Sequence, residues 1–159
     1  MQIAVIGAGD CRAEEYAGAR KIGELIAGEG GILVCGGLAG VMEAACRGAQ
    51  ERGGVTVGIL PGTAGGNRYL GIAIRTGLGH ARNAIVVQSA DAVIAVGGGH
   101  GTLSEIAIAL KAGVPVFGLR SWDIGGVVRC TGPEEAVAGA VAAARSYGSR
   151  VRSDDRGPL

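Results

Sequence analysis

Short apolar runs alternate with longer amphipathic segments along most of the chain. Runs typical of buried strands lie at residues 2–6, 32–35, 55–60, 72–75, 91–96, 114–119 and 127–130. Segments typical of helices lie at residues 13–27, 41–51, 80–89, 102–112 and 133–145. Because strands and helices alternate, we expect an α/β fold, with a doubly wound, mainly parallel sheet and helices on both faces.

The length and composition fit one folded unit. A chain of 159 residues, 48% of them hydrophobic, is long enough to bury a core. Its 32 glycines are spread between the apolar runs, where tight turns join strands to helices. We therefore predict a single domain over residues 1–147 and a polar, mobile C-terminal tail over residues 148–159.

Charge, aromatic content and cysteine spacing argue against several classes of partner. The net charge is +1 and aromatic residues make up 3% of the chain, so no nucleic-acid groove or base-stacking platform is expected. The chain has neither an apolar stretch of membrane-spanning length nor a basic leader, which predicts a cytoplasmic protein without a membrane partner. The four cysteines lack C-x-x-C spacing, so we expect reduced thiols and no metal site.

Glycine-rich turns follow three of the predicted strands, at residues 7–9, 36–40 and 97–101. Glycine lets the backbone approach a ligand closely, and parallel strands end at one edge of a sheet, so these turns can line one cleft. We expect Thr102 to cap the following helix, whose free N–H groups would attract an anion. The predicted phosphate-binding residues of these turns are Gly7, Gly9, Gly36, Gly37, Gly98, Gly99, His100, Gly101 and Thr102.

The glycine turns do not match the common nucleotide motifs. A dinucleotide fingerprint would have a third glycine at the position of Arg12 and an acidic residue near Cys35, so an NAD-dependent dehydrogenase is disfavoured. No Gly-Lys-Ser or Gly-Lys-Thr sequence occurs, which excludes a P-loop hydrolase. The two lysines, Lys21 and Lys111, lie in amphipathic helices, so a lysine decarboxylase that forms a Schiff base is also disfavoured.

Three further polar residues each have a functional and a structural interpretation. Arg82 begins a predicted helix, where the dipole disfavours a cation, so it either meets an anionic ligand or pairs with an acid such as Asp91. Asn83 either donates to a phosphate or lies on the surface. Glu105 either closes a capping box with Thr102 or acts in the cleft from the first turn of its helix.

Two motifs resemble those of the LONELY GUY-like superfamily of Rossmann-like proteins. Gly-Gly-His-Gly-Thr-Leu-Ser-Glu at 98–105 is similar to the signature Pro-Gly-Gly-x-Gly-Thr-x-x-Glu, and Gly-Gly-Leu-Ala-Gly-Val-Met at 36–42 is similar to Gly-Gly-x-x-Gly-Leu-Met. Arg82 matches the arginine that precedes the central strand. Segments 77–83 and 97–105 resemble the small bacterial branch that is similar to the molybdenum cofactor carrier protein.

The resemblance implies a Rossmann-like sheet, a homodimer or homotetramer, and a phosphorylated ligand at the glycine turns. That ligand would be a nucleotide or the molybdenum cofactor, with no further cofactor required. In the cytokinin-activating members, the matching arginine and glutamate serve hydrolysis of a nucleotide's N-glycosidic bond. This chain has Gly97 in place of the proline, Asn83 in place of a lysine and Ser104 in place of the first of two adjacent glutamates.

Two functions follow from these residues. The first is a binding or carrier protein for a nucleotide or a phosphorylated cofactor such as the molybdenum cofactor, which the missing cation and carboxylate favour. The alternative is a nucleoside 5′-monophosphate N-ribohydrolase that releases the base and ribose 5-phosphate. In such an enzyme Arg82 would hold the nucleotide, and Glu105 would orient water and stabilise the oxocarbenium-like centre. The sequence leaves open whether the chain is an enzyme.

Overall fold

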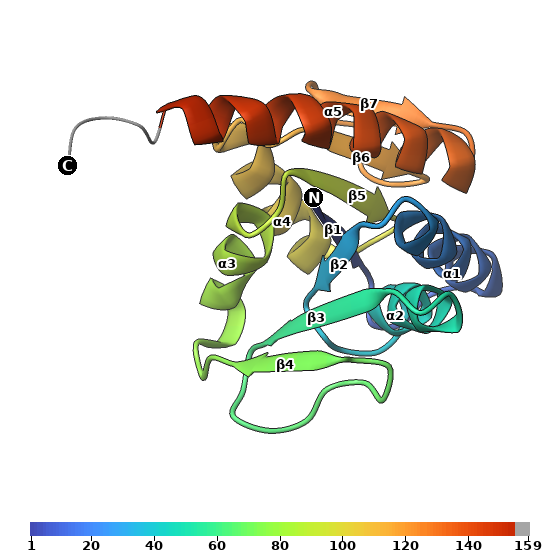
Figure 1. Ribbon diagram of the computed structural model, residues 1–159. Helices are drawn as coiled ribbons and strands as arrows, with labels where there is room; N and C mark the ends of the chain where they lie inside the picture. The colour runs from blue at the N-terminus through green and yellow to red at the C-terminus, as the bar shows by residue number, and fades with distance from the viewer. Residues whose placement is uncertain (155–159) are drawn as a thin grey trace.

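The computed structural model describes the backbone of residues 1–154 and the side chains of residues 1–146. Its centre is a seven-stranded sheet (Figure 1). In spatial order the strands are β4 (Ile72–Arg75), β3 (Val55–Leu60), β2 (Ile32–Cys35), β1 (Gln2–Gly7), β5 (Ala92–Val96), β6 (Val116–Leu119) and β7 (Val127–Cys130). All neighbouring strands are parallel, so their carboxyl ends share one edge of the sheet.

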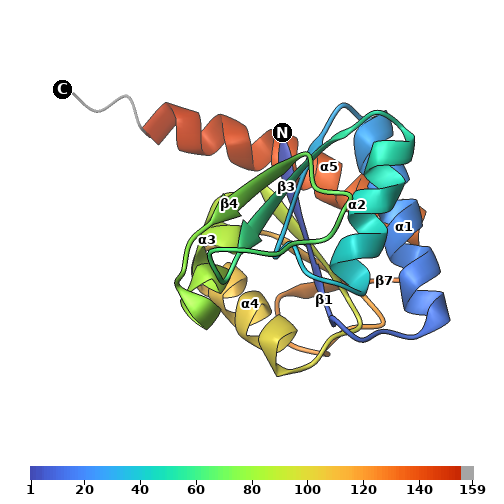
Figure 2. The ribbon, with the colours of Figure 1, turned by 90° about the horizontal axis from the view of Figure 1, so that it is seen from below.

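Helices cover both faces of the sheet (Figure 2). One face carries α1 (Ala13–Gly28), α2 (Val41–Glu51) and α5 (Pro133–Asp154), and the other carries α3 (Arg82–Gln88), which follows a 3₁₀ turn (Gly79–Ala81), and α4 (His100–Lys111). Successive side chains along a strand therefore point to opposite faces of the sheet and pack into different cores. Ile3 and Val5 of β1 pack with the core under α1, α2 and α5. Ala4 and Ile6 pack with the core under α3 and α4.

The structure confirms the doubly wound sheet that the sequence predicts, and β2, β3, β4 and β7 have the predicted bounds. β5 is buried along its whole length, as expected for a central strand of a parallel sheet. The connections from β3 to β4 and from β6 to β7 are parallel crossovers without an α-helix. Across the part of the chain that the structure describes, no helix is both long and apolar enough to cross a membrane.

The N-terminus of α4 differs from the prediction. The helix begins at His100 and its N-cap is Gly99, whose carbonyl oxygen accepts the N–H of Leu103 at 3.0 Å. The predicted Thr102 cap is therefore wrong, because Thr102 already lies within the first turn. Its side chain packs against Gly98 instead, where an added Cβ would lie 2.5 Å from the threonine.

The C-terminal helix is longer than predicted. α5 continues to Asp154, whereas the sequence analysis ends it at residue 145 and assigns residues 148–159 to a mobile tail. The backbone of residues 148–154 is therefore helical. A polar segment can continue a helix beyond the core because the helix satisfies its own backbone hydrogen bonds. Residues 155–159 lie outside the described part of the chain.

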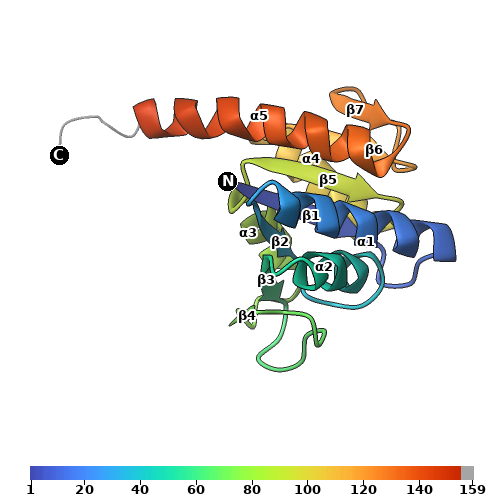
Figure 3. The same cartoon turned by 45° about the vertical axis from the view of Figure 1, so that its right-hand side comes forward.

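Helices α1 and α2 lie side by side (Figure 3) and touch backbone to backbone at two glycines. A Cβ on Gly23 would lie 1.9 Å from the carbonyl oxygen of Ala45. A Cβ on Gly48 would likewise lie 1.9 Å from the carbonyl oxygen of Arg20. No other residue type fits at these two positions, so the glycines fix the distance between the helices.

Gly48→Ala should destabilise the protein, because the added methyl group would overlap the backbone of α1. We expect the free energy of unfolding to fall by about 1–3 kcal/mol. Gly28→Ala is the control, because a Cβ at Gly28, the last residue of α1, would meet no heavy atom within 4 Å. Urea unfolding followed by circular dichroism measures both variants, and equal effects would contradict the proposed contact.

Candidate functional site

A cleft opens at the carboxyl edge of the sheet, beside the ends of β1 and β5. The strand order reverses here, because the chain continues from β1 into α1 on one face and from β5 into α4 on the other. Open α/β sheets bind ligands at such a point. The cleft has a volume of about 610 Å³, typical of small-molecule sites. Its lining residues are Gly7, Ala8, Gly9, Asp10, Leu38, Met42, Pro61, Gly79, His80, Arg82, Asn83, Gly99, Gly101, Thr102 and Glu105.

Three of the predicted glycines leave their backbone open to the cleft. An added Cβ at Gly9, Gly99 or Gly101 would meet no heavy atom within 4 Å, and all three residues line the cleft. A ligand can therefore approach the main chain at these positions without a side chain in the way.

The other predicted glycines are required by packing. The side chains that an added Cβ would meet are Val41 at Gly7, Arg82 at Gly36, Leu60 at Gly37 and Thr102 at Gly98, at 2.3–2.5 Å. Of these four glycines, Gly7 lines the cleft and the other three do not. Gly37 and Gly98 also have positive φ angles of 73° and 111°. At these four positions packing therefore excludes a larger side chain.

The first turn of α4 forms one wall of the cleft. Gly99, Gly101 and Thr102 of this turn line the cleft. The first N–H groups of a helix have no partner within the helix, and they lie at the positive end of its dipole. With 12 residues, α4 is long enough for this effect. The turn therefore has the features of a phosphate site.

Arg82 and Glu105 form a buried ion pair that joins α3 to α4 at the cleft. Arg82 Nη1 lies 3.6 Å from Glu105 Oε1, and each residue is only 6% exposed. Arg82 thus pairs with an acid, as the structural interpretation expected, but this acid is Glu105 rather than Asp91, and the predicted capping box is absent. Glu105 has no capping box to close, because Thr102 is not the N-cap. The Asp91 carboxylate accepts the backbone N–H of Gln2 at 2.7 Å rather than pairing with Arg82.

Burial dominates the electrostatics of this pair. Desolvation raises the pKa of Glu105 to about 7, although the positive charge of Arg82 opposes the rise. Desolvation also lowers the pKa of Arg82, although Glu105 opposes that change. Arg82 Nε is buried without a hydrogen-bond partner among the described residues, which is costly for a charged donor. The attraction between Arg82 and Glu105 thus offsets only part of the free-energy cost of burying their charges. An anionic ligand group near Arg82 would offset a further part of this cost.

Asn83 is buried and connects α3 to the first turn of α4. Its Nδ2 donates to Ser104 Oγ at 3.1 Å, and the Ser104 hydroxyl donates to the carbonyl oxygen of Gly101 at 2.7 Å. Asn83 also lines the cleft, so it is within reach of a ligand. Asn83 and Ser104 occupy two positions at which this chain departs from the LONELY GUY-like pattern. The structure shows that these two departures form one neutral hydrogen-bonded contact.

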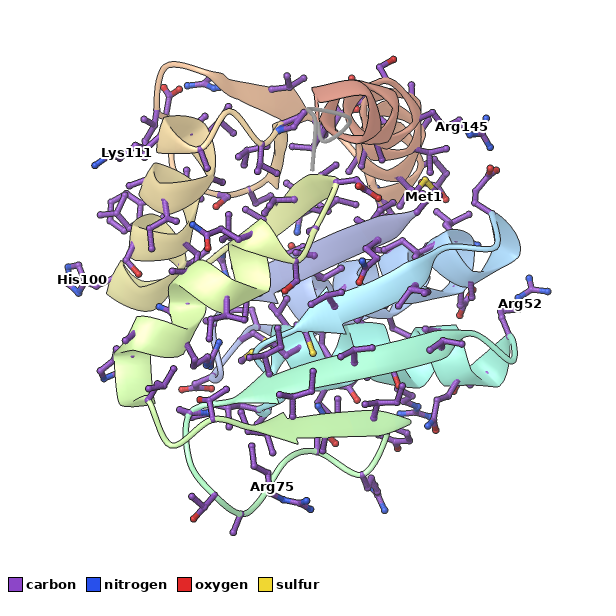
Figure 4. The ribbon with its side chains drawn as sticks, turned by 60° about the vertical axis from the view of Figure 1, so that its left-hand side comes forward. Met1, Arg52, Arg75, His100, Lys111 and Arg145 are labelled. Atoms are coloured by element: carbon purple, nitrogen blue, oxygen red, sulfur yellow. The ribbon has the colours of Figure 1, made fainter. Side chains whose placement is uncertain are left out.

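The two histidines have different positions relative to the cleft. His100, a predicted ligand residue, points away from the body of the protein at the start of α4 (Figure 4) and is not a lining residue. Its ring centroid lies 6.4 Å from that of Trp122. His80 does line the cleft, although the sequence analysis did not select it. The feature of the sequence that could have identified His80 as a cleft residue is its position two residues before Arg82.

Three apolar lining residues were also missed by the sequence analysis. Leu38 and Met42 flank the second glycine turn, and Pro61 directly follows β3. Leu38 and Pro61 lie just beyond the carboxyl ends of β2 and β3, and Met42 lies in the first turn of α2, positions that could have marked them as candidates.

Two thiols lie beneath the second glycine turn. The sulfur atoms of Cys35 in β2 and Cys46 in α2 are 3.5 Å apart, and the N–H of Gly37 donates to Cys35 Sγ at 3.3 Å. The hydrogen bond to Cys35, together with burial, raises the pKa of Cys46. Hydrogen bonds from Cys46 and Gly37 lower the pKa of Cys35. The thiol pair thereby supports the turn that places Gly36 against the guanidinium of Arg82.

The raised pKa of Glu105 predicts a stability that depends on pH. Between pH 4.5, where an unperturbed glutamate titrates, and about pH 7, the folded protein keeps a proton that the unfolded chain has released. The stability that protonated Glu105 contributes is therefore complete below pH 4.5 and falls as the pH rises to 7. Glu105→Gln is neutral throughout and lacks this dependence.

Relative to Glu105→Gln, the unmodified protein should lose about 3 kcal/mol of unfolding free energy between pH 4.5 and 8. Urea unfolding at a series of pH values gives both profiles. Parallel profiles would show that Glu105 titrates normally.

Sequence comparisons agree with the motifs. Residues 1–146 match the SLOG cluster4 family. A relative from Archaeoglobus fulgidus is 53% identical over 139 residues, which cover 86% of this chain and 92% of the relative. The probable cytokinin riboside 5′-monophosphate phosphoribohydrolase LOGL9 from Oryza sativa subsp. japonica is 31% identical over 87 residues, which cover 52% of this chain and 38% of LOGL9.

Two solved structures resemble the chain over nearly their whole length. The molybdenum cofactor binding protein from Rippkaea orientalis has a TM-score of 0.84 at 39% identity, with 89% of this chain and 95% of that chain covered. The molybdenum cofactor carrier protein from Chlamydomonas reinhardtii has a TM-score of 0.83 at 37% identity, with 89% and 97% covered. Given the match over residues 1–146 and the Rossmann-like α/β sheet, this chain belongs to the SLOG cluster4 family.

Proposed function

We propose that this chain binds a small phosphorylated ligand in the cleft and acts as its carrier, with the molybdenum cofactor as the first candidate. The open first turn of α4 carries this proposal, because Gly99 and Gly101 leave the helix N-terminus uncovered at the point where the strand order reverses. The proteins from Rippkaea orientalis and Chlamydomonas reinhardtii, named for binding and carrying the molybdenum cofactor, support this ligand class.

The remainder of the cleft suits the ring system of such a ligand. Leu38, Met42 and Pro61 contribute apolar lining, and Leu38 is 40% exposed although it is a large hydrophobic residue. Apolar side chains exposed in a concave site beside a few polar groups are typical of a ligand-binding surface. A compound with both a ring and a phosphate group, such as a pterin phosphate or a nucleotide, matches the two parts of the cleft.

Gly99→Val should prevent binding while it leaves the fold intact. The φ angle of Gly99 is −99°, which other residues adopt, and the added side chain would project into open space. We expect the affinity for molybdenum cofactor released anaerobically from a molybdoenzyme to fall by at least about tenfold, as measured by ultrafiltration. Gly28→Val, at the end of α1 remote from the cleft, should bind as the unmodified protein does. Equal affinity of all three proteins would contradict the proposed site.

A second function has one observation in its favour. With a pKa of about 7, Glu105 can exchange a proton near neutral pH, as a general acid or base must. The similarity to part of LOGL9 supports a nucleoside 5′-monophosphate as the substrate. Arg82 would then hold the nucleotide, and Glu105 would orient the attacking water. We favour the carrier, because the neutral contact of Asn83 with Ser104 leaves fewer charges around a reacting sugar.

A panel of nucleoside 5′-monophosphates separates the two functions. For a carrier, chromatography should detect no free base or ribose 5-phosphate, and ligand binding should persist in Glu105→Gln. For a hydrolase, kcat/KM should fall by at least about hundredfold in Glu105→Gln and should depend on a group with a pKa near 7. Turnover that disappears in Glu105→Gln would overturn the carrier proposal.

A further inference from the structure

The segment at residues 120–123, which follows β6, holds the glycine turn in front of α4. The hydroxyl of Ser121 donates to the carbonyl oxygen of Gly97 at 2.7 Å, and Trp122 Nε1 donates to that of Gly99 at 3.3 Å. Two peptide groups of the turn are thus held by two side chains from outside it. Neither side chain lines the cleft of about 610 Å³; both line a separate hollow together with Gly97 and Gly98 of the turn.

The geometry of the peptide group links these bonds to the direction in which N–H groups of the turn point. In a trans peptide, the carbonyl of one residue and the N–H of the next point in opposite directions. When Ser121 holds the Gly97 carbonyl, the N–H of Gly98 points away from the 120–123 segment. When Trp122 holds the Gly99 carbonyl, the N–H of His100, the first of α4, also points away from it.

Glycine makes such external support necessary. Gly97 and Gly98 have φ angles of 52° and 111°, and glycine populates both signs of φ about equally. An unsupported run of glycines would therefore rotate its peptide groups freely, and successive N–H groups would not converge on an anion. Convergent N–H groups of this kind form an anion-binding concavity only when the peptide orientations are fixed.

The 120–123 segment is itself fixed at both ends. Arg120 has a φ of 52°, an uncommon value for a residue other than glycine, and its guanidinium pairs with Glu14 of α1. At the other end, Arg129 Nε of β7 donates to Asp123 Oδ1 at 2.9 Å. Backbone strain of this kind persists where the surroundings determine the conformation. The segment is thus tied to α1 at one end and to β7 at the other.

We propose that Ser121 and Trp122 are positioning residues, which orient the glycine turn so that its N–H groups face a phosphate of the ligand. This inference rests on the proposed function, since it assigns to these two side chains the preorganisation of the anion site. Neither residue touches the ligand.

The test follows the backbone N–H signals by NMR while inorganic phosphate is added. Ser121→Ala and Trp122→Phe each remove one donor, and each should weaken phosphate binding by about threefold to tenfold. Added phosphate should slow hydrogen exchange at Gly98 and His100 less in both variants than in the unmodified protein, with the remaining amides unchanged. Ser121→Thr keeps the hydroxyl and should restore both properties.

Ser89→Ala is the matched control, because Ser89 at the far end of α3 donates a comparable bond to the Ile85 carbonyl at 2.6 Å. It should bind phosphate as the unmodified protein does. The inference is overturned if the unmodified protein binds phosphate and the two donor variants bind it equally well, or if exchange accelerates throughout the chain. Absence of phosphate binding by the unmodified protein would overturn the proposed function, and the inference with it.

Discussion

The parallel pairing of β1 with β5 is the interaction on which the site depends. Its last register pair joins Gly7 to Val96, so two glycine turns leave the sheet at the same level. One turn leads to α1 and the other to α4, on opposite faces. The turns must therefore diverge, and the cleft is the space that their divergence leaves. The apolar composition of both strands thus determines the position of the site before any polar residue contributes to it.

The polar groups of the cleft lower the stability that this core supplies. Arg82 and Glu105 are held at 3.6 Å by helices whose apolar residues, such as Val86 and Ile106, are fully buried. Burial of the two charges is compensated only in part, as the raised pKa of Glu105 indicates. Binding sites commonly contain groups of this kind, because arrangements that favour a ligand are often unfavourable without it.

The sequence predicts the elements of this fold well because their cause is local. An apolar run such as 92–96 forms a buried strand whatever its neighbours are, and the edge shared by parallel strands then places Gly9 and Gly99 together. The contacts that complete the site are not local. The bond between Asn83 and Ser104 and the support of Gly97 by Ser121 join residues more than twenty positions apart, and no periodicity encodes them.

At the start of α4, the local sequence pattern predicts a different helix start from the one observed. Thr102 and Glu105 have the spacing of a capping box, yet the helix starts at His100 with glycine as its N-cap. Thr102 fills the space above Gly98, and Glu105 pairs with Arg82 from another helix. A tertiary contact thus overrides a local motif at the point where the chain forms its site.

The glycine contact between α1 and α2 has a mechanical consequence for the cleft. Because the two backbones touch at Gly23 and Gly48, neither helix can slide or rotate against the other without overlap. Both helices begin beside the cleft, and Gly40 at the start of α2 lies against the carbonyl of Ala8. The side of the cleft formed by the starts of α1 and α2 is therefore held in a fixed arrangement. On the opposite side of the cleft, α3 and α4 are joined by contacts between side chains. We therefore expect any widening of the cleft to come from movement of α3 and α4.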